Sequence, residues 1–347
     1  MTTREKTIEE HTYTSTGIKF WLHQKQMENY RTKSSNSIIS THVSPEGACN
    51  LKCPYCSVTH RKTHHRIELE VIKDYILKLK SRGLKAVILT GGGEPTAYKH
   101  FNKLVKWLKN QELSVALITN GTLTRRVEDD VWNLFSWIRV SINAFESWET
   151  KIALPVNFIS DKCIVGCSTV FTKLHEKPEE LDNTLEYFKK VSKVADNCRA
   201  KYIRVLPNCL LPQKELIADH NKLDNIFLKL NDSRFFHQYK IHGAPKSSIC
   251  HQAYFRPYLS EVNGGTVFPC DSVVLNESIA HFNKDYELCK ASEILKFLDG
   301  TIKQKFDPRE RCKGCVFTDN VNMLHDWKEQ GIKQSIPNIE IIHEEFV

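Results

Sequence analysis

The stretch IISTHVSPEGACNLKCPYCS, residues 38–57, joins a short β-branched segment to three closely spaced cysteines. Residues 38–43 have the length and composition of a β-strand. Cys49, Cys53 and Cys56 follow at gaps of three and two residues. A disulfide needs an even number of thiols, and a closed zinc site usually takes four protein ligands. Three thiols therefore predict a metal site with one open position, where chemistry can take place.

Five more strand-like segments follow and alternate with segments whose apolar residues recur at helical spacing. All six strands are expected to be apolar on both faces, as buried parallel strands are. The alternation predicts parallel β/α units and an α/β fold, a partial (β/α)6 barrel similar to a TIM barrel. In such barrels ligands bind at the carboxyl ends of the strands. The five further strands are expected at residues 85–90, 114–119, 137–143, 162–171 and 202–207.

The chain divides into four expected parts. In the first, residues 19–31 are predicted to form one short helix that lies on the barrel. In the third, Asn263 and two glycines predict a hairpin turn. The expected boundaries are 1–37 for a polar N-terminal extension, 38–245 for the barrel, 246–330 for a small cysteine-rich α+β domain and 331–347 for a C-terminal tail.

Composition favours a cytoplasmic protein. The chain has 347 residues, of which 41% are hydrophobic, and a net charge of +8. Its first residues are polar and do not form a secretory leader, and the longest apolar runs are too short to span a bilayer. Twelve cysteines are many for a compartment in which disulfides do not persist. Spaced groups of cysteines then indicate metal or redox chemistry, with no membrane partner.

Two motifs resemble those of the radical S-adenosylmethionine (radical SAM) enzymes. CNLKCPYC, residues 49–56, resembles their Cys-x3-Cys-x2-Cys signature, and TGGGEPT, residues 90–96, resembles their Gly-Gly-Glu motif after the second strand. The resemblance implies that the three cysteines hold a 4Fe–4S cluster, whose fourth iron chelates S-adenosylmethionine. One-electron cleavage of this cofactor would give a 5′-deoxyadenosyl radical that removes hydrogen from a substrate. The chain is therefore expected to be an oxidoreductase or modifying enzyme.

The same resemblance implies which residues contact S-adenosylmethionine. Glycines after the second strand offer backbone groups at close range, because no side chain blocks the approach. Ser141 and Asn143 are equally compatible with ordinary polar strand ends. A zinc site made by the three cysteines and a histidine is the alternative, although zinc does not need the glycine motif. The implied cofactor-binding residues are Tyr55, Gly91, Gly92, Gly93, Glu94, Asn120, Ser141 and Asn143.

A second group of cysteines follows the barrel. Cys250 and Cys270 are separated by fourteen residues, Gly265 and four more residues, and the pair Cys312 and Cys315 comes later. This pattern resembles the twitch domain, a short relative of the SPASM domain of some radical SAM enzymes. The resemblance implies one auxiliary 4Fe–4S cluster that accepts or relays an electron. Four thiolates also suit a structural zinc ion, which is the alternative.

Residues around the sixth strand are candidates for substrate contact. Arg204 is the better one, because a guanidinium can hold a carboxylate or phosphate through two hydrogen bonds. A structural ion pair is the alternative for Arg204. Cys209, just beyond the strand, is a weaker candidate for facing the active site. The cysteines interpreted as buried packing residues are Cys163, Cys167, Cys198 and Cys289.

Several substrate classes remain open at this point. A small molecule or a nucleotide fits a short chain with a twitch-like domain. A nucleobase in DNA or RNA is an alternative, prompted by the net charge and by the basic run at residues 59–66. A peptide is a further alternative. A non-enzymatic iron–sulfur electron carrier does not account for the glycine motif. An enzyme of this kind would receive electrons from a partner such as flavodoxin or ferredoxin.

Overall fold

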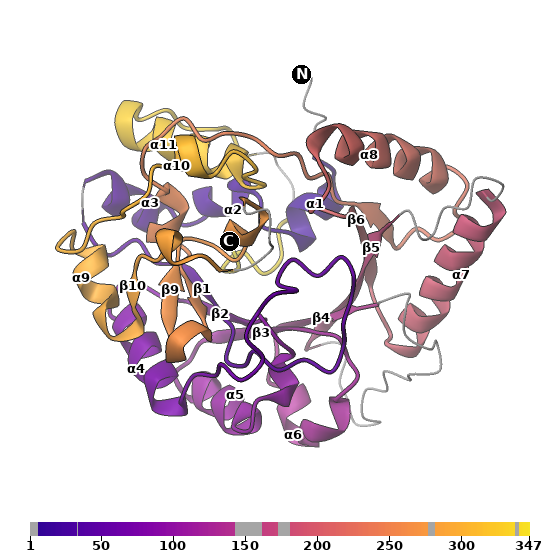
Figure 1. Ribbon diagram of the computed structural model, residues 1–347, viewed down its shortest axis with the longest axis horizontal. Coiled ribbons are helices and arrows are strands. Elements are labelled where there is room, and N and C mark those ends of the chain that lie inside the picture. The colour runs from indigo at the N-terminus through magenta and orange to yellow at the C-terminus, as the bar shows by residue number, and fades with distance from the viewer. Residues whose placement is uncertain (1–5, 33, 143–161, 173–180, 277–281, 337–339) are drawn as a thin grey trace.

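The structure is a computed structural model that describes residues 6–32, 34–142, 162–172, 181–276, 282–336 and 340–347. Within these residues, ten strands form one curved sheet (Figure 1). They are β1 (Ser40–Val43), β2 (Ala86–Leu89), β3 (Ser114–Thr119), β4 (Trp137–Ser141), β5 (Ile164–Phe171), β6 (Tyr202–Pro207), β7 (Phe235–His237), β8 (Tyr258–Ser260), β9 (Thr266–Phe268) and β10 (Cys289–Lys290). Their order in space is β10-β9-β8-β1-β2-β3-β4-β5-β6-β7.

Strands β1 to β7 all run parallel, which confirms the predicted α/β class and the partial barrel. The six strands expected from the sequence are all present. Strand β7 was not expected, because three residues are too few to show a periodicity of apolar side chains. Parallel strands place their carboxyl ends at one rim of the barrel, so the loops after β1, β2 and β3 meet there beside the end of β4.

Helices cover the outside of this sheet. Figure 1 shows α4 to α8 following one another around it. Their apolar faces pack on outward-pointing strand residues such as Val87, Val115 and Ile203, which are fully buried. The helices are α1 (Ile8–Tyr13), α2 (Gly17–Trp21), α3 (Gln24–Arg31), α4 (Leu69–Lys80), α5 (Phe101–Asn110), α6 (Asp129–Trp132), α7 (Leu181–Asn197), α8 (Gln213–Phe227), α9 (Ile294–Leu298), α10 (Pro308–Arg311) and α11 (Thr318–Gln330).

The inward-facing side of the strands differs from the expectation. Ala116 and Trp137 belong to a small apolar cluster inside the barrel. Farther along, β4 carries Arg139 and β6 carries Arg204, and both side chains line an internal cavity. The expectation of strands apolar on both faces was wrong for these positions. A barrel that encloses a ligand cavity needs polar groups inside, whereas a filled barrel does not.

Both ends of the chain pack onto the barrel. The single helix expected at residues 19–31 is two helices, α2 and α3, separated at Leu22 and His23. The Trp21 ring meets the Trp327 ring of α11 edge-on, with centroids 5.2 Å apart. Phe346 lies against Trp137 at the closed end of the barrel. Described residues of the N-terminal extension and of the C-terminal tail therefore pack against the rest of the fold.

The predicted hairpin is present and belongs to the main sheet. Strand β8 pairs with β9 in antiparallel register, Leu259 opposite Val267, and the turn is a short 3-10 segment, Val262–Gly264. Asn263 in that turn has a φ of 50°, a conformation that asparagine tolerates better than most residues. Strand β8 also runs parallel beside β1. None of the described helices is long and apolar enough to cross a membrane.

Candidate active site

One cavity of about 250 Å³ at the mouth of the barrel gathers the residues expected to hold the first cluster and S-adenosylmethionine. Asn143 lies outside the described residues, and every other residue in that expectation lines this cavity. The first and the last of these residues, Cys49 and Ser141, are more than 90 positions apart in sequence. The rim of the barrel brings them together. The predicted residues in its wall are Cys49, Cys53, Tyr55, Cys56, Gly91, Gly92, Gly93, Glu94, Asn120 and Ser141.

The three cysteines occupy the loop between β1 and α4. The Asn120 side-chain amide lies 3.7 Å from Cys49 Sγ, and Arg61 Nη1 lies 3.5 Å from Cys56 Sγ. Burial raises the pKa of the Cys49 thiol, so a nearby cationic centre is needed to hold it as a thiolate. Arg61 belongs to the basic run at residues 59–66, and its contacts fold that part of the run back onto the cysteine loop.

Gly92 and Gly93 allow the loop after β2 to pack closely against neighbouring segments. A Cβ atom on Gly93 would lie 2.2 Å from the carbonyl oxygen of Ala48. A Cβ on Gly92 would lie 2.0 Å from the Glu261 carboxylate, and the Gly92 N–H donates to Ser44 Oγ at 2.7 Å. A side chain at Gly93 would push the cysteine loop away, and one at Gly92 would displace Glu261. The glycines are therefore required by packing, in addition to any contact with a ligand.

Glu94 joins the ends of two strands. Its buried carboxylate accepts hydrogen bonds from Thr119 Oγ1 at 2.5 Å and from the Asn120 N–H at 2.8 Å. It also accepts from the Thr96 hydroxyl at 2.7 Å and from the Thr96 N–H at 3.1 Å. Because both oxygens are engaged, the carboxylate positions Asn120 and the loop after β2. A direct bond from Glu94 to the cofactor stays a prediction.

This site fits a 4Fe–4S cluster that binds S-adenosylmethionine. Three soft thiolates are the ligands that iron–sulfur clusters take, and the open side of the cavity carries glycine backbone, Asn120 and Ser141. Such polar groups suit the amino, carboxylate and ribose groups of a nucleoside cofactor. The individual roles of Tyr55, Asn120 and Ser141 stay predictions.

The second group of cysteines also converges. Cys250, Cys270, Cys312 and Cys315 line one small cavity of about 20 Å³. Cys315 is held there by a backbone bridge to Gly243. Burial and, to a lesser extent, the neighbouring Cys315 raise the pKa of the Cys250 thiol to about 12. A metal centre would offset the charge of such thiolates, which are otherwise too costly to bury.

Among the described residues, no group of three or more His, Cys, Asp or Glu side chains is arranged to hold a single metal ion. A cubane cluster and a tetrahedral zinc ion both take four thiolates, so the auxiliary cluster stays a prediction at this site.

A third cavity, of about 320 Å³, occupies the barrel interior and borders both cysteine sites. Tyr55, Ser57 and Ile118 line it together with the first site. Phe317 and Ser272 line it together with the second site. We refer to it below as the central cavity.

Basic side chains dominate the charged lining of the central cavity. Arg204, the substrate-anchor candidate, is among them, and Cys209 lines the cavity as well. Sequence reasoning missed the other four. Arg139 could have been found, because a charged residue inside an otherwise apolar strand is unusual unless it is paired. The remaining three lie in segments without such a signal. The basic lining residues are Lys19, Arg139, Arg204, Lys240 and Arg256.

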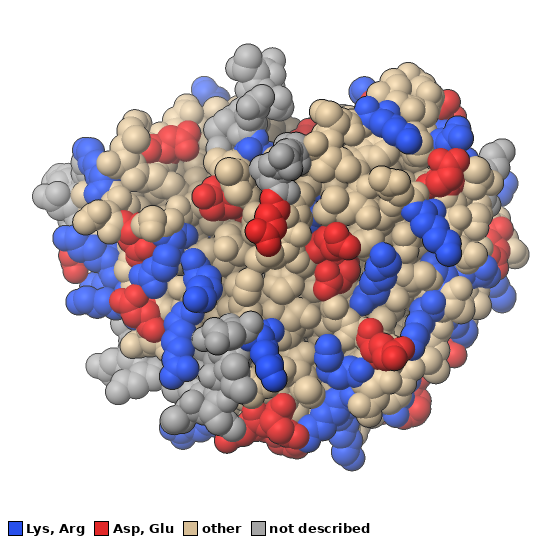
Figure 2. Space-filling model, turned by 180° about the vertical axis from the view of Figure 1, so that it is seen from behind, with Lys and Arg blue, Asp and Glu red and all other residues tan. Residues whose placement is uncertain are grey.

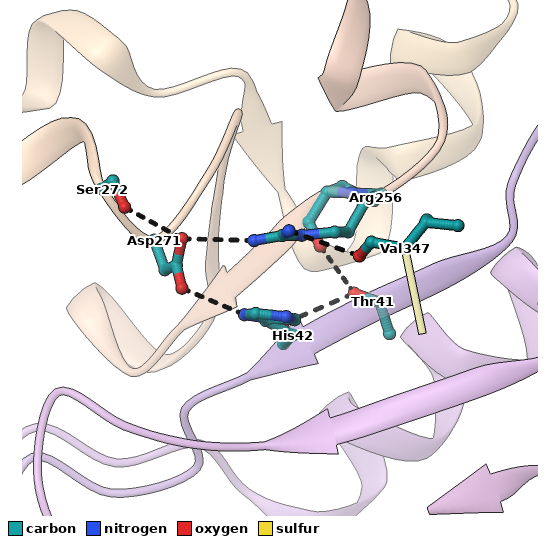
Figure 3. Close-up of polar contacts among 7 residues, drawn as sticks. Thr41, His42, Arg256, Asp271, Ser272 and Val347 are labelled. Carbon is teal, nitrogen blue, oxygen red and sulfur yellow. Dashed lines mark hydrogen bonds and ion pairs between the residues drawn. The ribbon is translucent and has the colours of Figure 1, made fainter. Parts of the chain in front are cut away.

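Asp271 forms a small network at one wall of this cavity. Figure 3 shows His42, from β1, and Arg256, which precedes β8, both directed at its carboxylate. His42 Nδ1 donates to Asp271 Oδ2 at 3.2 Å, and Arg256 Nη2 donates to Oδ1 at 3.3 Å. Burial alone would raise the pKa of Asp271, but contact with His42 and the charge of Arg256 hold it below its usual range. His42 Nε2 is buried and has no hydrogen-bond partner.

The cysteines interpreted as packing residues are buried in the structure. Cys163, Cys167 and Cys198 lie in the main core between sheet and helices. Cys289 on β10 belongs to the same core. Burial raises the pKa of the Cys163 thiol to about 12, so it stays protonated and unreactive at neutral pH.

Known proteins resemble this chain in sequence. Residues 43–151 match the family model of the radical SAM superfamily. A 7-carboxy-7-deazaguanine synthase from Aquifex aeolicus is 33% identical over 175 residues, which are 49% of this chain and 74% of that protein. An S-adenosylmethionine-dependent nucleotide dehydratase from Selenomonas ruminantium is 29% identical over 119 residues, 33% of this chain. The matched region spans only 42% of the length of that dehydratase.

Solved structures share the fold. Streptococcus suis SuiB, bound to its precursor peptide SuiA, has a TM-score of 0.51 and 13% sequence identity, and the match covers 89% of this chain and 77% of SuiB. At this identity the likeness concerns the fold alone. The family model, the Aquifex relative and the barrel agree with one another, and this protein belongs to the radical SAM superfamily.

Proposed function

We propose that this radical SAM enzyme removes a hydrogen atom from a small molecule or nucleotide held in the central cavity, and that an auxiliary 4Fe–4S cluster then takes an electron from the substrate. The main observation in support is the position of the central cavity, which shares wall residues with both cysteine sites. A substrate there would lie between a source of radicals and an electron acceptor.

When bound, the first cluster and S-adenosylmethionine supply a 5′-deoxyadenosyl radical, after one electron from a flavodoxin- or ferredoxin-like donor breaks the sulfonium C–S bond. The chain orients the reactants. Cys49, Cys53 and Cys56 leave one coordination position open, and Tyr55 stands in the wall between the cofactor cavity and the central cavity. Enclosure by the barrel keeps water away from the reacting carbon.

The proposed reaction is a net two-electron oxidation of the substrate. A C–H hydrogen goes to the 5′-deoxyadenosyl carbon, one electron goes to the auxiliary cluster, and one proton goes to a base. His42 is the base that the cavity offers, because Asp271 holds Nδ1 while Nε2 has no partner. Burial and the charge of Arg256 lower the pKa of His42, so its imidazole is neutral near pH 7 and can accept a proton.

Three features support a small molecule over a macromolecule. The central cavity is internal and about 320 Å³ in volume, the usual size of a small-ligand site. On the face in Figure 2, Lys and Arg side chains are interspersed with Asp and Glu, so this face offers no continuous basic track for a nucleic acid. One relative acts on nucleotides according to its name, which favours a nucleotide. SuiB, bound to a precursor peptide, keeps a peptide as the second candidate.

The auxiliary site is tested by metal analysis and by one substitution. Anaerobically reconstituted protein is expected to hold about eight iron and about eight sulfide per chain, as two cubane clusters require. Four iron and one zinc would contradict the auxiliary cluster. Cys312→Ala is expected to retain formation of 5′-deoxyadenosine and to lose the oxidised product. Cys163→Ala, a buried cysteine outside both sites, is the matched control.

Substrates can be screened by isotope transfer. Candidate molecules deuterated at one C–H position are incubated with reduced enzyme, and deuterium in 5′-deoxyadenosine marks the substrate and the position attacked. Protein that contains both clusters but makes no 5′-deoxyadenosine under reducing conditions would contradict the proposal and favour an electron carrier.

A further inference from the structure

The charged lining of the central cavity is strongly unbalanced. Five basic residues line it, and Asp271 is the one carboxylate among its described lining residues. Asp271 is already paired with Arg256 and His42. Within the described part of the chain, no carboxylate forms an ion pair with the four remaining basic residues. These four are Lys19, Arg139, Arg204 and Lys240.

Arg204 presents one donor that no protein group uses. Its Nη1 donates to Gln238 Oε1 at 2.9 Å. Its Nε is buried and has no hydrogen-bond partner. A buried guanidinium donor without an acceptor costs free energy, and the cost is recovered when a ligand brings one. Arg204 stands on β6, in register with Ser168 on β5, so its position comes from the sheet and not from a loop.

Lys240 and Arg139 are held by groups that leave their charge uncompensated. The Lys240 ammonium lies 4.6 Å from the centre of the Phe317 ring, which attracts a cation but carries no net charge. Arg139 donates to the Tyr202 hydroxyl at 3.2 Å and to the Tyr13 carbonyl oxygen at 2.7 Å, both neutral. Lys19 donates to the carbonyl oxygen of His343, at 3.3 Å, and Glu345 lies near enough to offset part of its charge.

Burial lowers the pKa of two of these cations. It lowers the pKa of Lys240 to about 8 and that of Arg204 to about 9, and the charge of Arg139 adds to the effect on Arg204. Cations gathered in a protein interior without anions are unfavourable. A bound anion would reverse the effect and hold all of them charged.

We propose that the central cavity binds a phosphate-bearing small molecule, with Arg204, Lys240 and Arg139 on the phosphate. This inference rests on the proposed function and narrows its substrate class. A single carboxylate carries one negative charge and would leave most of the excess uncompensated. A phosphate ester carries about two, and an arginine fork matches its oxygens. The volume of about 320 Å³ leaves room for a sugar or nucleoside beside the phosphate.

Calorimetric titration of anaerobically reconstituted holoenzyme tests the inference. S-Adenosylmethionine is present in excess, so that the cofactor cavity is filled. The probes are ribose 5-phosphate, ribose and glucuronate, which differ in carrying a phosphate, no charge or a carboxylate. Ribose 5-phosphate is expected to bind at least about tenfold more tightly than the other two, because charge-assisted hydrogen bonds are the strong ones.

Two pairs of variants locate the binding. Arg204→Gln and Lys240→Met are each expected to weaken ribose 5-phosphate about tenfold or more. Arg125→Gln and Lys305→Met, which change exposed residues outside the cavity, are the matched controls and should leave binding unchanged. Arg204→Lys keeps the charge and should retain part of the affinity. This result would show that the weaker binding of Arg204→Gln comes from a lost contact and not from misfolding of the barrel. The cluster absorbance of each variant is recorded beside the titration.

Three results would overturn the inference: no binding of ribose 5-phosphate by the wild-type holoenzyme, equal binding of glucuronate, or equal weakening by the surface controls. Cleavage of S-adenosylmethionine is measured in the same samples. Wild-type enzyme that makes 5′-deoxyadenosine but ignores phosphate would remove the phosphate site and leave the proposed function standing. Loss of cleavage itself, with both clusters present, would count against the proposed function.

Discussion

The Thr119 hydroxyl donates a hydrogen bond to Glu94, with 2.5 Å between Oγ1 and Oε1. Thr119 ends β3 and Glu94 follows β2, so this bond ties two strand ends at the barrel mouth. The second oxygen of Glu94 accepts from the Asn120 N–H. The spatial relation between the glycine loop and Asn120 therefore depends on one buried carboxylate, whose position is determined by its neighbours.

Glu94→Gln is expected to lower the free energy of unfolding by about 1–3 kcal/mol and to weaken S-adenosylmethionine binding. The amide that replaces one oxygen turns a donor toward another donor, so a buried group loses its partner. Urea denaturation and equilibrium binding of the cofactor measure the two effects. Glu112→Gln, at an exposed residue, is the control. Unchanged stability together with lost cofactor binding would instead indicate direct contact between Glu94 and the cofactor.

Gly166→Ala is expected to destabilise the barrel by about 1–3 kcal/mol, because overpacking shifts side chains or backbone. A Cβ at this position would lie 2.0 Å from the Tyr202 ring, which packs directly over Gly166. Tyr202→Leu should relieve part of the clash. A double-mutant cycle measured by chemical denaturation would show this as a loss smaller than the sum of the single losses. Strict additivity would contradict the account.

Phe346→Ala is expected to cost about 3 kcal/mol of stability, the usual scale for deleting a buried aromatic side chain. Phe346 is 3% exposed, and its ring centroid lies 5.4 Å from that of Trp137 at the closed end of the barrel. The denaturation midpoint gives the measurement. Ile336→Ala removes a side chain that is 41% exposed and should have almost no effect. Equal losses in both variants would show that Phe346 does not contribute to the core.

Stability should rise with pH above 7 because of Lys19. The pKa of Lys19 is lowered from its ordinary 10.5 to about 7, mainly by burial. The charge of Glu345 raises this pKa, and the charge of Arg139 lowers it. Between these values the unfolded chain binds a proton that the folded chain does not, so the free energy of unfolding increases with pH. Below pH 7 both states are protonated and the full penalty of burying the charge remains.

Lys19→Met is therefore expected to be more stable than the wild type at pH 7 in phosphate-free buffer, by roughly a few kcal/mol. The difference should shrink as the pH approaches 10. Urea denaturation at several pH values measures it, and Lys305→Met, at an exposed lysine, should show no such trend. A constant difference between Lys19→Met and wild type across this pH range would contradict the depressed pKa.

Much of the first site could be read from neighbouring residues. The gaps between Cys49, Cys53 and Cys56 are local, and so is the run of glycines after β2. The strands were found because each has its own length and apolar pattern, which is a property of a few adjacent residues. The hairpin at Asn263 follows in the same way, because turn chemistry is local. β7 was missed for the same reason, since three residues carry too little pattern.

The central cavity could not be read in this way. Lys19, Arg139, Arg204, Lys240 and Arg256 come from five separate segments, and no short-range rule connects them. Their convergence depends on the register of the strands and on the two chain ends that pack onto the barrel. An alternative such as an ion pair for Arg204 could be set aside only when the surrounding charges were known.

The class of fold and the two sets of thiols could thus be predicted from the spacing of the cysteines, the apolar pattern of the strands and the turn residues. Each of these features is a property of a few residues that are adjacent in sequence. Packing decided the rest: which cations face one another, how Asp271 is shared, and where a substrate would lie relative to the two cysteine sites. Those relations arise from contacts between residues far apart in the chain. They depend on how the strands and chain ends close around the barrel, and a one-dimensional pattern does not carry that information.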